Sequence, residues 1–94
     1  MLTYRFDPEI VQIQEDADGD DVEFRIRVLK EQPLAVDGLK QARAWFESNE
    51  VHTDVLFYAY PDQTYKVIVR RDYYVEFVLE LMKHRLLQSV EWKA

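Results

Sequence analysis

Apolar and polar residues alternate along four stretches of the chain, and this alternation predicts four strands that each bury one face. The stretches are residues 22–28, 53–60, 65–70 and 89–93. The second and third stretches are rich in β-branched and aromatic residues, which strands favour. Pro61-Asp62 lies between these two stretches and is typical of a tight turn, so we expect them to form a hairpin.

Two helices are predicted between these strands. Asp37 precedes apolar residues at helical spacing, so its carboxylate is expected to cap the first helix, which Ser48-Asn49 should end. The second helix is expected over residues 73–87, which contain neither glycine nor proline, with Asp72 as its cap. Because its apolar residues occupy more than one side, this helix should be buried on more than one side.

The N-terminal residues predict two further short strands. Apolar residues alternate in residues 2–6 and again in residues 11–14, and Asp7-Pro8 separates the two stretches. Residues 16–20 are acidic and contain a glycine, so we expect them to form a hairpin loop that leads into the next strand.

From residue 22 onward the predicted order is strand, helix, strand, strand, helix, strand. This order resembles the ferredoxin-like (split βαβ) fold, an α+β arrangement with an antiparallel sheet and both helices on one face. We expect residues 1–94 to form one domain, in which residues 1–21 extend a ferredoxin-like core over residues 22–94. The resemblance concerns element order alone and implies no function, because this fold hosts many unrelated functions.

The N-terminal extension conflicts with this arrangement at one edge of the sheet. In a ferredoxin-like sheet the first strand lies between the third and the fourth. A hairpin of residues 9–15 with residues 21–29 would occupy the edge that the final strand needs. Either the N-terminal strand pairs elsewhere, or the topology is a variant.

Composition restricts the class of protein and the kinds of site. The chain has 94 residues, of which 48% are hydrophobic, so it is long enough to build one core. It contains no cysteine, which excludes disulfides, thiolate zinc sites and iron–sulfur clusters. No apolar run approaches the roughly 18 residues of a membrane helix. We expect a cytoplasmic protein with no cofactor, no specific metal and no membrane partner.

The formal charge of −6 is concentrated near the N-terminus. Residues 1–23 contain eight acids and one arginine, whereas residues 24–94 contain eleven cations and ten acids. The acids of the predicted loop are Asp16, Asp18, Asp20 and Asp21. Their spacing resembles that of a calcium-binding loop, but Asp21 and Arg27 stand where such a loop requires glycine and glutamate. We interpret the run as a solvated acidic loop.

The sheet face that the predicted helices leave open combines aromatic, aliphatic and cationic residues. Alternation assigns to it Arg25, Arg27, Leu56, Tyr58, Tyr60, Lys66, Ile68 and Arg70. This set is too apolar to be simply solvated and too charged for an internal core. It would be covered by residues 1–14 through Leu2, Tyr4 and Phe6, by a second copy of the chain, or by nucleic acid.

Nucleic acid is the weakest of these three interpretations. The RNA-recognition motif has the same element order, but residues 65–70 lack the glycine-and-aromatic signature of its third strand. The strand over residues 22–28 offers arginines instead of a stacking ring. Together with the acidic balance of the chain, these differences argue against a nucleic-acid partner.

The remaining polar residues form no strong motif. Residues 70–72 join a strand to a helix with two arginines and an aspartate, and they could hold an anion, although the aspartate is expected to neutralise its neighbour. Neither His52 nor His84 has a companion at metal-ligand spacing. His84 follows Glu80 by four residues, so we expect the two to pair on the helix surface.

These observations favour a non-catalytic interaction module. We expect it to bind a second copy of itself or another protein through Arg25, Arg27, Tyr58, Tyr60, Lys66, Ile68 and Arg70. One alternative is an acidic adaptor or decoy that presents residues 15–21 to a basic partner. The other is a small-molecule-binding protein or enzyme with a pocket on the sheet face, in which Tyr58, Tyr60 and His52 would act.

Overall fold

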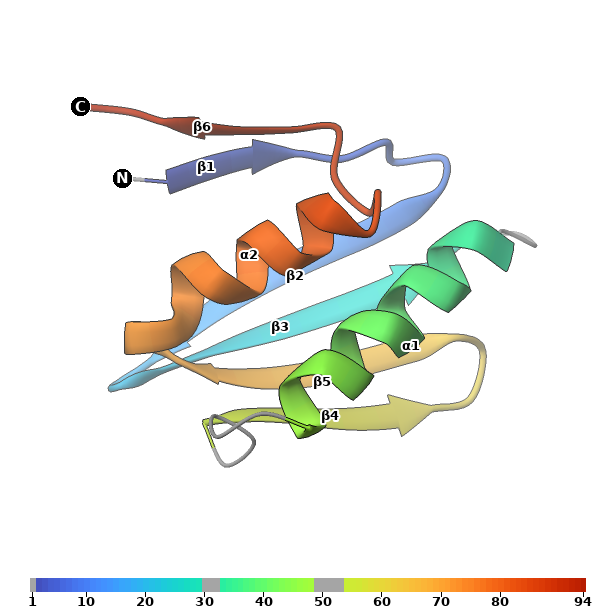
Figure 1. Ribbon diagram of the computed structural model, residues 1–94, viewed down its shortest axis with the longest axis horizontal. Helices are drawn as coiled ribbons and strands as arrows, with labels where there is room; N and C mark the ends of the chain where they lie inside the picture. Colours follow the sequence, from blue (N-terminus) through green and yellow to red (C-terminus); the bar gives the residue numbers. More distant parts are fainter. Residues whose placement is uncertain (1, 30–32, 49–53) are drawn as a thin grey trace.

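Four strands form the central antiparallel sheet, because each of them alternates apolar and polar side chains and so buries one face. The computed structural model describes residues 2–29, 33–48 and 54–94. The strand order across this sheet is β2-β3-β5-β4 (Figure 1). The strands are β2 (Val11–Asp18), β3 (Asp21–Val28), β4 (Val55–Tyr60) and β5 (Thr64–Arg70). The predicted hairpin is confirmed, with Tyr60 opposite Thr64.

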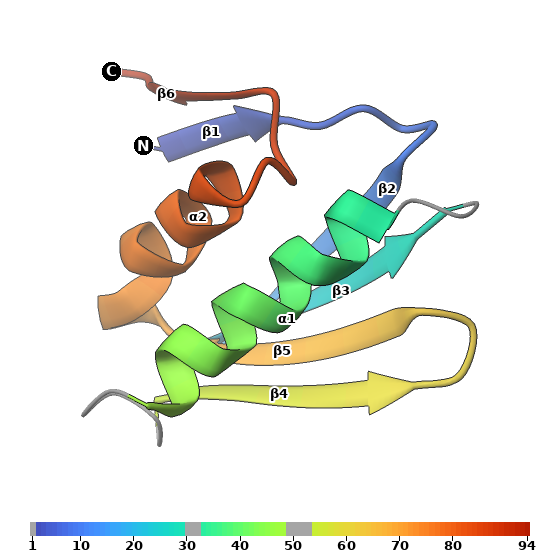
Figure 2. The same cartoon turned by 45° about the vertical axis from the view of Figure 1, so that its right-hand side comes forward.

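Two helices cover one face of this sheet (Figures 1 and 2). They are α1 (Pro33–Glu47) and α2 (Tyr74–Lys83), and a short 3-10 helix, η1 (Arg71–Tyr73), precedes α2. Phe77 of α2 is fully buried among three phenylalanines of other elements. Its ring centroid lies 4.6 Å from that of Phe24, 5.8 Å from that of Phe46 and 6.0 Å from that of Phe57. The core therefore lies between the sheet and the helices, and the predicted α+β class is confirmed.

The first helix begins earlier than the sequence predicts. Pro33 is its first residue, and proline costs no hydrogen bond there, because the first N–H groups of a helix have no partner within it. Asp37 lies inside α1 and does not cap it, so that prediction is wrong. The helix ends at Glu47, next to Ser48 as expected, and Asn49 lies outside the described residues.

The second helix begins after the residue that we expected to cap it. Asp72 lies within η1, and Tyr73 occupies the capping position of α2 without a capping hydrogen bond from its side chain. The prediction of Asp72 as the cap is therefore wrong. The extra 3-10 turn explains the difference, because it carries the chain from the end of β5 into α2 without a polar cap.

The second helix also ends earlier than predicted, at Lys83 instead of residue 87. Arg85 has a φ of 64°, in the left-handed region, and this conformation ends the helix. The Arg85 N–H donates to the Met82 carbonyl at 3.0 Å, and the Leu86 N–H donates to the Leu81 carbonyl at 2.9 Å. These two bonds satisfy carbonyl groups that the end of a helix would otherwise leave free.

A separate antiparallel ribbon consists of β1 (Leu2–Arg5) and β6 (Ser89–Trp92). Figure 1 shows this ribbon beside α2. The two predicted strands are confirmed, but the final strand does not lie in the central sheet. β2 occupies that edge, because the Gly19-Asp20 turn brings it beside β3 at once, whereas β6 comes much later in the sequence.

The acidic segment is mostly strand and not the loop that we expected. β2 continues to Asp18, and only Gly19 and Asp20 turn the chain. Gly19 has a φ of 61°, which glycine adopts at little cost. Asp16 lies opposite Glu23 across the hairpin. The acids of this segment other than Asp20 are therefore held at fixed positions in the sheet.

The N-terminal segment packs on the helix side of the sheet (Figure 2). Leu2 belongs to the buried core, and Tyr4 and Phe6 pack against that core. The interpretation in which residues 1–14 cover the opposite face is therefore wrong.

Candidate functional site

The open face of the central sheet presents the side chains that point away from α1 and α2. Strand register arranges these side chains in four rows that run across the strands from β4 to β2. The rows are Tyr60, Thr64, Arg27 and Gln12; Tyr58, Lys66, Arg25 and Gln14; Leu56, Ile68, Glu23 and Asp16; and Arg70, Asp21 and Asp18. We call these residues the open face.

An apolar and aromatic stripe runs along the edge strand of the open face. Leu56, Tyr58 and Tyr60 follow one another on β4 with exposed fractions of 40%, 44% and 50%. Ile68 lies beside Leu56 on β5 and is half-buried. Adjacent exposed aromatic and aliphatic side chains are typical of a surface that contacts another molecule.

Charge is divided between the two ends of the open face. The two rows nearest the turn between β4 and β5 contain Arg25, Arg27 and Lys66 and no acid. The other two rows contain four acids and a single cation, Arg70; the acids are Asp16, Asp18, Asp21 and Glu23. Along β3 the charged side chains therefore read acid, acid, cation, cation.

Glu23 stands at the boundary between these two ends and pairs with both neighbouring cations. Its Oε1 lies 3.2 Å from Lys66 Nζ, and its Oε2 accepts a hydrogen bond of 3.2 Å from Arg25 Nε. These contacts, with the Lys66 contact the larger, lower the pKa of Glu23 below its ordinary value. Arg27 makes no ion pair with any residue that the structure describes, so its charge is available to a partner.

Two hollows flank Arg25 on the open face. One has a volume of about 280 Å³ and lies between Tyr60 and Lys66, and the other has about 150 Å³ and lies towards Gln12 and Gln14. Both are too small for most drug-sized ligands, which occupy roughly 300–1,000 Å³. The hollows could instead each accept a side chain of a partner.

The structure places all seven residues predicted to bind a partner on this one face. They are Arg25, Arg27, Tyr58, Tyr60, Lys66, Ile68 and Arg70. Arg70 lies at the acidic end, where its Nε is 3.6 Å from Asp54 Oδ1. The prediction did not include Asp21 and Glu23, although the same alternation along β3 places them on this face. His52 lies outside the described residues.

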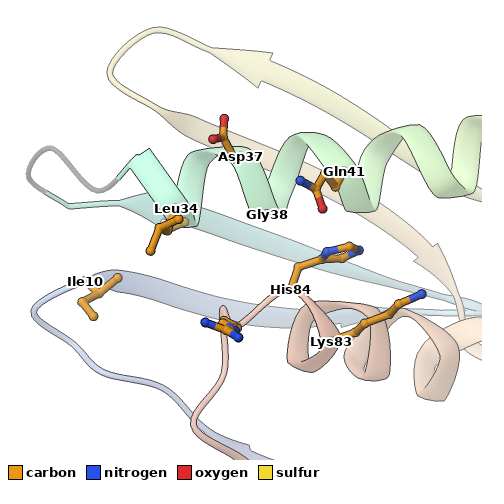
Figure 3. A pocket seen from close by; sticks show the side chains of 9 residues that line it. Ile10, Leu34, Asp37, Gly38, Gln41, Lys83 and His84 are labelled. Atoms are coloured by element: carbon orange, nitrogen blue, oxygen red, sulfur yellow. The ribbon is translucent and has the colours of Figure 1, made fainter.

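A groove between α1 and α2 is a second candidate site (Figure 3). Its volume is about 400 Å³, and its lining includes Leu34, Gly38 and His84. His84 Nε2 lies 3.2 Å from Glu80 Oε2, with exposed fractions of only 15% and 12% for the two side chains. The two predicted partners are therefore within ion-pair distance, but they are largely buried instead of lying on the helix surface. Their burial favours a structural role at the end of α2.

No described group of three or more His, Cys, Asp or Glu side chains could hold a metal ion. None of the described helices is long and apolar enough to span a membrane. No protein-family model, curated protein sequence or solved structure matches this chain.

Proposed function

We propose that this protein is an interaction module that associates with a second copy of itself through the open face. The observation that carries the proposal is the order of charges along β3, which are Asp21, Glu23, Arg25 and Arg27 from one end to the other. This order is self-complementary, because reversing the strand exchanges acids for cations.

A two-fold axis that lies between two such sheets, perpendicular to their strands, makes use of this order. The axis keeps each strand opposite its own copy and reverses its direction, as an isologous interface requires. If the axis passes between Glu23 and Arg25, each Glu23 faces the second copy's Arg25, and each Asp21 faces the second copy's Arg27. Two sheets packed face to face lie roughly 10 Å apart, a distance that these long side chains can span.

The same axis brings the apolar stripe against its own copy. Leu56 and Tyr58 on one chain then face Tyr58 and Leu56 on the other. Burying such side chains stabilises an interface by about 25 cal/mol per Å² of apolar surface removed from water. Complementary charges mainly select the orientation of the two copies and accelerate their encounter. The apolar stripe would therefore supply affinity and β3 would supply orientation.

The fold is consistent with this role. Strands β3, β4 and β5 with α1 and α2 follow the ferredoxin-like order. We therefore regard these elements as a ferredoxin-like core in which β2 takes the place of the final strand. Both helices lie on one face of the sheet, which leaves the other face accessible. The absence of cysteine supports a cytoplasmic location.

Charge reversal and mixing test the proposal. Sedimentation velocity of the unaltered chain is expected to give a dimer at concentrations on the order of tens of micromolar, because mass action favours association as the concentration rises. The variants Arg25→Glu/Arg27→Glu and Asp21→Arg/Glu23→Arg should each be monomeric, because each places like charges opposite one another. A mixture of the two variants should form a heterodimer, and a variant with all four changes should again form a homodimer.

A matched control and two outcomes complete this experiment. Lys40→Glu/Arg43→Glu changes the charge by the same amount on α1, away from the open face, and should leave the dimer intact. A monomeric parent chain, or charge-reversed variants that remain dimeric, would overturn the proposal. If the monomeric parent instead bound a lysine-rich peptide in a salt-sensitive manner, the acidic-adaptor alternative would replace it.

A further inference from the structure

A second cavity outside the open face lies on the helix side of the sheet. It has a volume of about 480 Å³ and is bounded by α2, the β1–β6 ribbon and the β2–β3 hairpin. Apolar side chains form most of its lining, among them Leu2, Val22, Val75 and Trp92. Trp92 has an exposed fraction of 68%. A cavity of this size, apolar and with few polar groups, suits a small organic ligand.

One carboxylate, that of Glu15, lines this cavity and is held by two hydroxyl groups from other elements. Its Oε2 accepts hydrogen bonds from the Tyr4 hydroxyl of β1 and, at 3.0 Å, from the Tyr74 hydroxyl of α2. Burial, followed by these hydrogen bonds to Glu15, raises the pKa of both tyrosines above their ordinary value. The hydroxyls therefore remain donors at neutral pH, and the carboxylate is fixed as the acceptor.

Both hydroxyls bind the same oxygen of Glu15. The other oxygen, Oε1, accepts no hydrogen bond from any residue that the structure describes. The Glu15 side chain is exposed, so water reaches this oxygen. A cationic donor in the cavity would replace that water with a charge-assisted hydrogen bond, which is about twice as strong as a neutral one.

Arg71 is the cation that lines the same cavity, and it is held at the end of the cavity opposite Glu15. Its Nε donates to the Gly19 carbonyl at 2.6 Å, at the turn of the β2–β3 hairpin. Four residues of extended chain separate Glu15 from Gly19, which corresponds to about 13 Å. No ion pair joins Arg71 to Glu15 among the described residues, so the cavity presents a carboxylate at one end and a guanidinium at the other.

We propose that this cavity binds a small organic ammonium compound with an apolar or aromatic body. The ammonium group donates to Oε1 of Glu15, and the body packs against Val22, Val75 and Trp92. A ligand with a carboxylate in that position would be repelled by Glu15, and a neutral alcohol would lose the charge-assisted bond. This site does not use the open face, so its occupancy is independent of self-association.

Fluorescence of Trp92 tests this site directly, because the indole lines the cavity. The variant Trp45→Phe leaves Trp92 as the single tryptophan. In this variant, 2-phenylethylammonium at millimolar concentrations is expected to change the fluorescence saturably. The neutral 2-phenylethanol should bind at least about tenfold more weakly, and 3-phenylpropionate should not bind, because each lacks the cation that Glu15 selects.

Substitution of Glu15 identifies the group that is responsible. Glu15→Gln, made in the Trp45→Phe chain, keeps an oxygen that can accept from both tyrosine hydroxyls but removes the charge. It should weaken the binding of the ammonium compound at least about tenfold and leave the binding of the alcohol unchanged. Glu76→Gln removes an exposed acid of α2 that does not line the cavity, and it should have no effect.

The outcomes separate this proposal from the proposed dimer. Equal binding of amine and alcohol, no saturable binding of the amine, or an unchanged affinity in Glu15→Gln would each overturn the site. Circular dichroism and thermal unfolding check that Glu15→Gln is folded. Repeating the titration with Arg25→Glu/Arg27→Glu should give the same affinity, whether or not the parent chain is a dimer.

Discussion

Arg85 adopts a backbone conformation that its side chain does not favour. Its φ of 64° places it in the left-handed region, which costs about 1–2 kcal/mol for a residue with a Cβ atom. The position follows the last turn of α2, where helices very commonly have glycine. The hydrogen bonds of Arg85 and Leu86 to the end of the helix hold the conformation in place.

Replacing this arginine by glycine should therefore stabilise the protein. Arg85→Gly is expected to raise the free energy of unfolding by about 1 kcal/mol, because glycine removes the steric cost, although it also gains freedom in the unfolded chain. Urea unfolding at a fixed protein concentration measures the change. Lys83→Gly, two residues earlier and inside α2, should instead lower stability by about 1 kcal/mol. A loss of stability in Arg85→Gly would contradict this account.

At the scale of elements, α1 carries a glycine where it lies against the residue that follows α2, His84. A Cβ atom added to Gly38 would lie 2.6 Å from the His84 carbonyl oxygen and 3.2 Å from the His84 Cβ. The first distance is shorter than van der Waals contact allows, and the obstacle is backbone. Gly38 therefore sets how closely α1 and the end of α2 can pack.

Alanine at this position should destabilise the fold, although alanine normally stabilises a helix. Gly38→Ala gains about 1 kcal/mol of helix propensity but forces α1 and α2 apart, which costs roughly 1–3 kcal/mol or more. We expect a net loss in urea unfolding. Lys40→Ala, exposed on the same helix, is the control and should change stability by less than about 0.5 kcal/mol. A more stable Gly38→Ala would show that the helices can separate freely.

The strands were predictable because alternation reports burial locally. Residues 22–28 and 65–70 became β3 and β5 with nearly the same bounds, and the same alternation placed the residues that we propose to bind a partner on one face. The caps were not predictable, since Pro33 and η1 start the helices where no aspartate is needed. The cluster at Glu15 was also missed, because Tyr74 lies 59 residues from it in sequence.

For the whole molecule, the proposed dimer depends on carboxylates that must be ionised. The hydrogen bond from Lys66, and then that from Arg25, lower the pKa of Glu23 below its ordinary value of 4.5. A carboxylate whose pKa is lowered by its partners stabilises the paired state while it is ionised. This stabilisation is lost as the pH falls through the lowered pKa. Glu23 therefore keeps its charge through the mildly acidic range.

Self-association should follow the same dependence on pH. The dimer is expected to persist from pH 7 to about 5 and to weaken at least tenfold near pH 3, where protonated acids leave mutually repelling cations on both copies. Sedimentation velocity measures the association, and circular dichroism at each pH separates dissociation from unfolding. Glu23→Gln should associate more weakly at pH 7 and respond less to acid. A dimer that tightens at pH 3 would contradict the charge arrangement.

The β1–β6 ribbon has a consequence for the order of folding. Thr3 pairs with Glu91, so this contact closes a loop of 88 residues, whose entropy costs about 4 kcal/mol before any contact compensates for it. The β2–β3 and β4–β5 hairpins close much shorter loops and should form first. During synthesis, β1 leaves the ribosome before β6 and lacks this partner until β6 has emerged. Until then, Tyr4 has no ribbon to hold it against Glu15, so the cavity at Glu15 is completed only after β1 and β6 have paired.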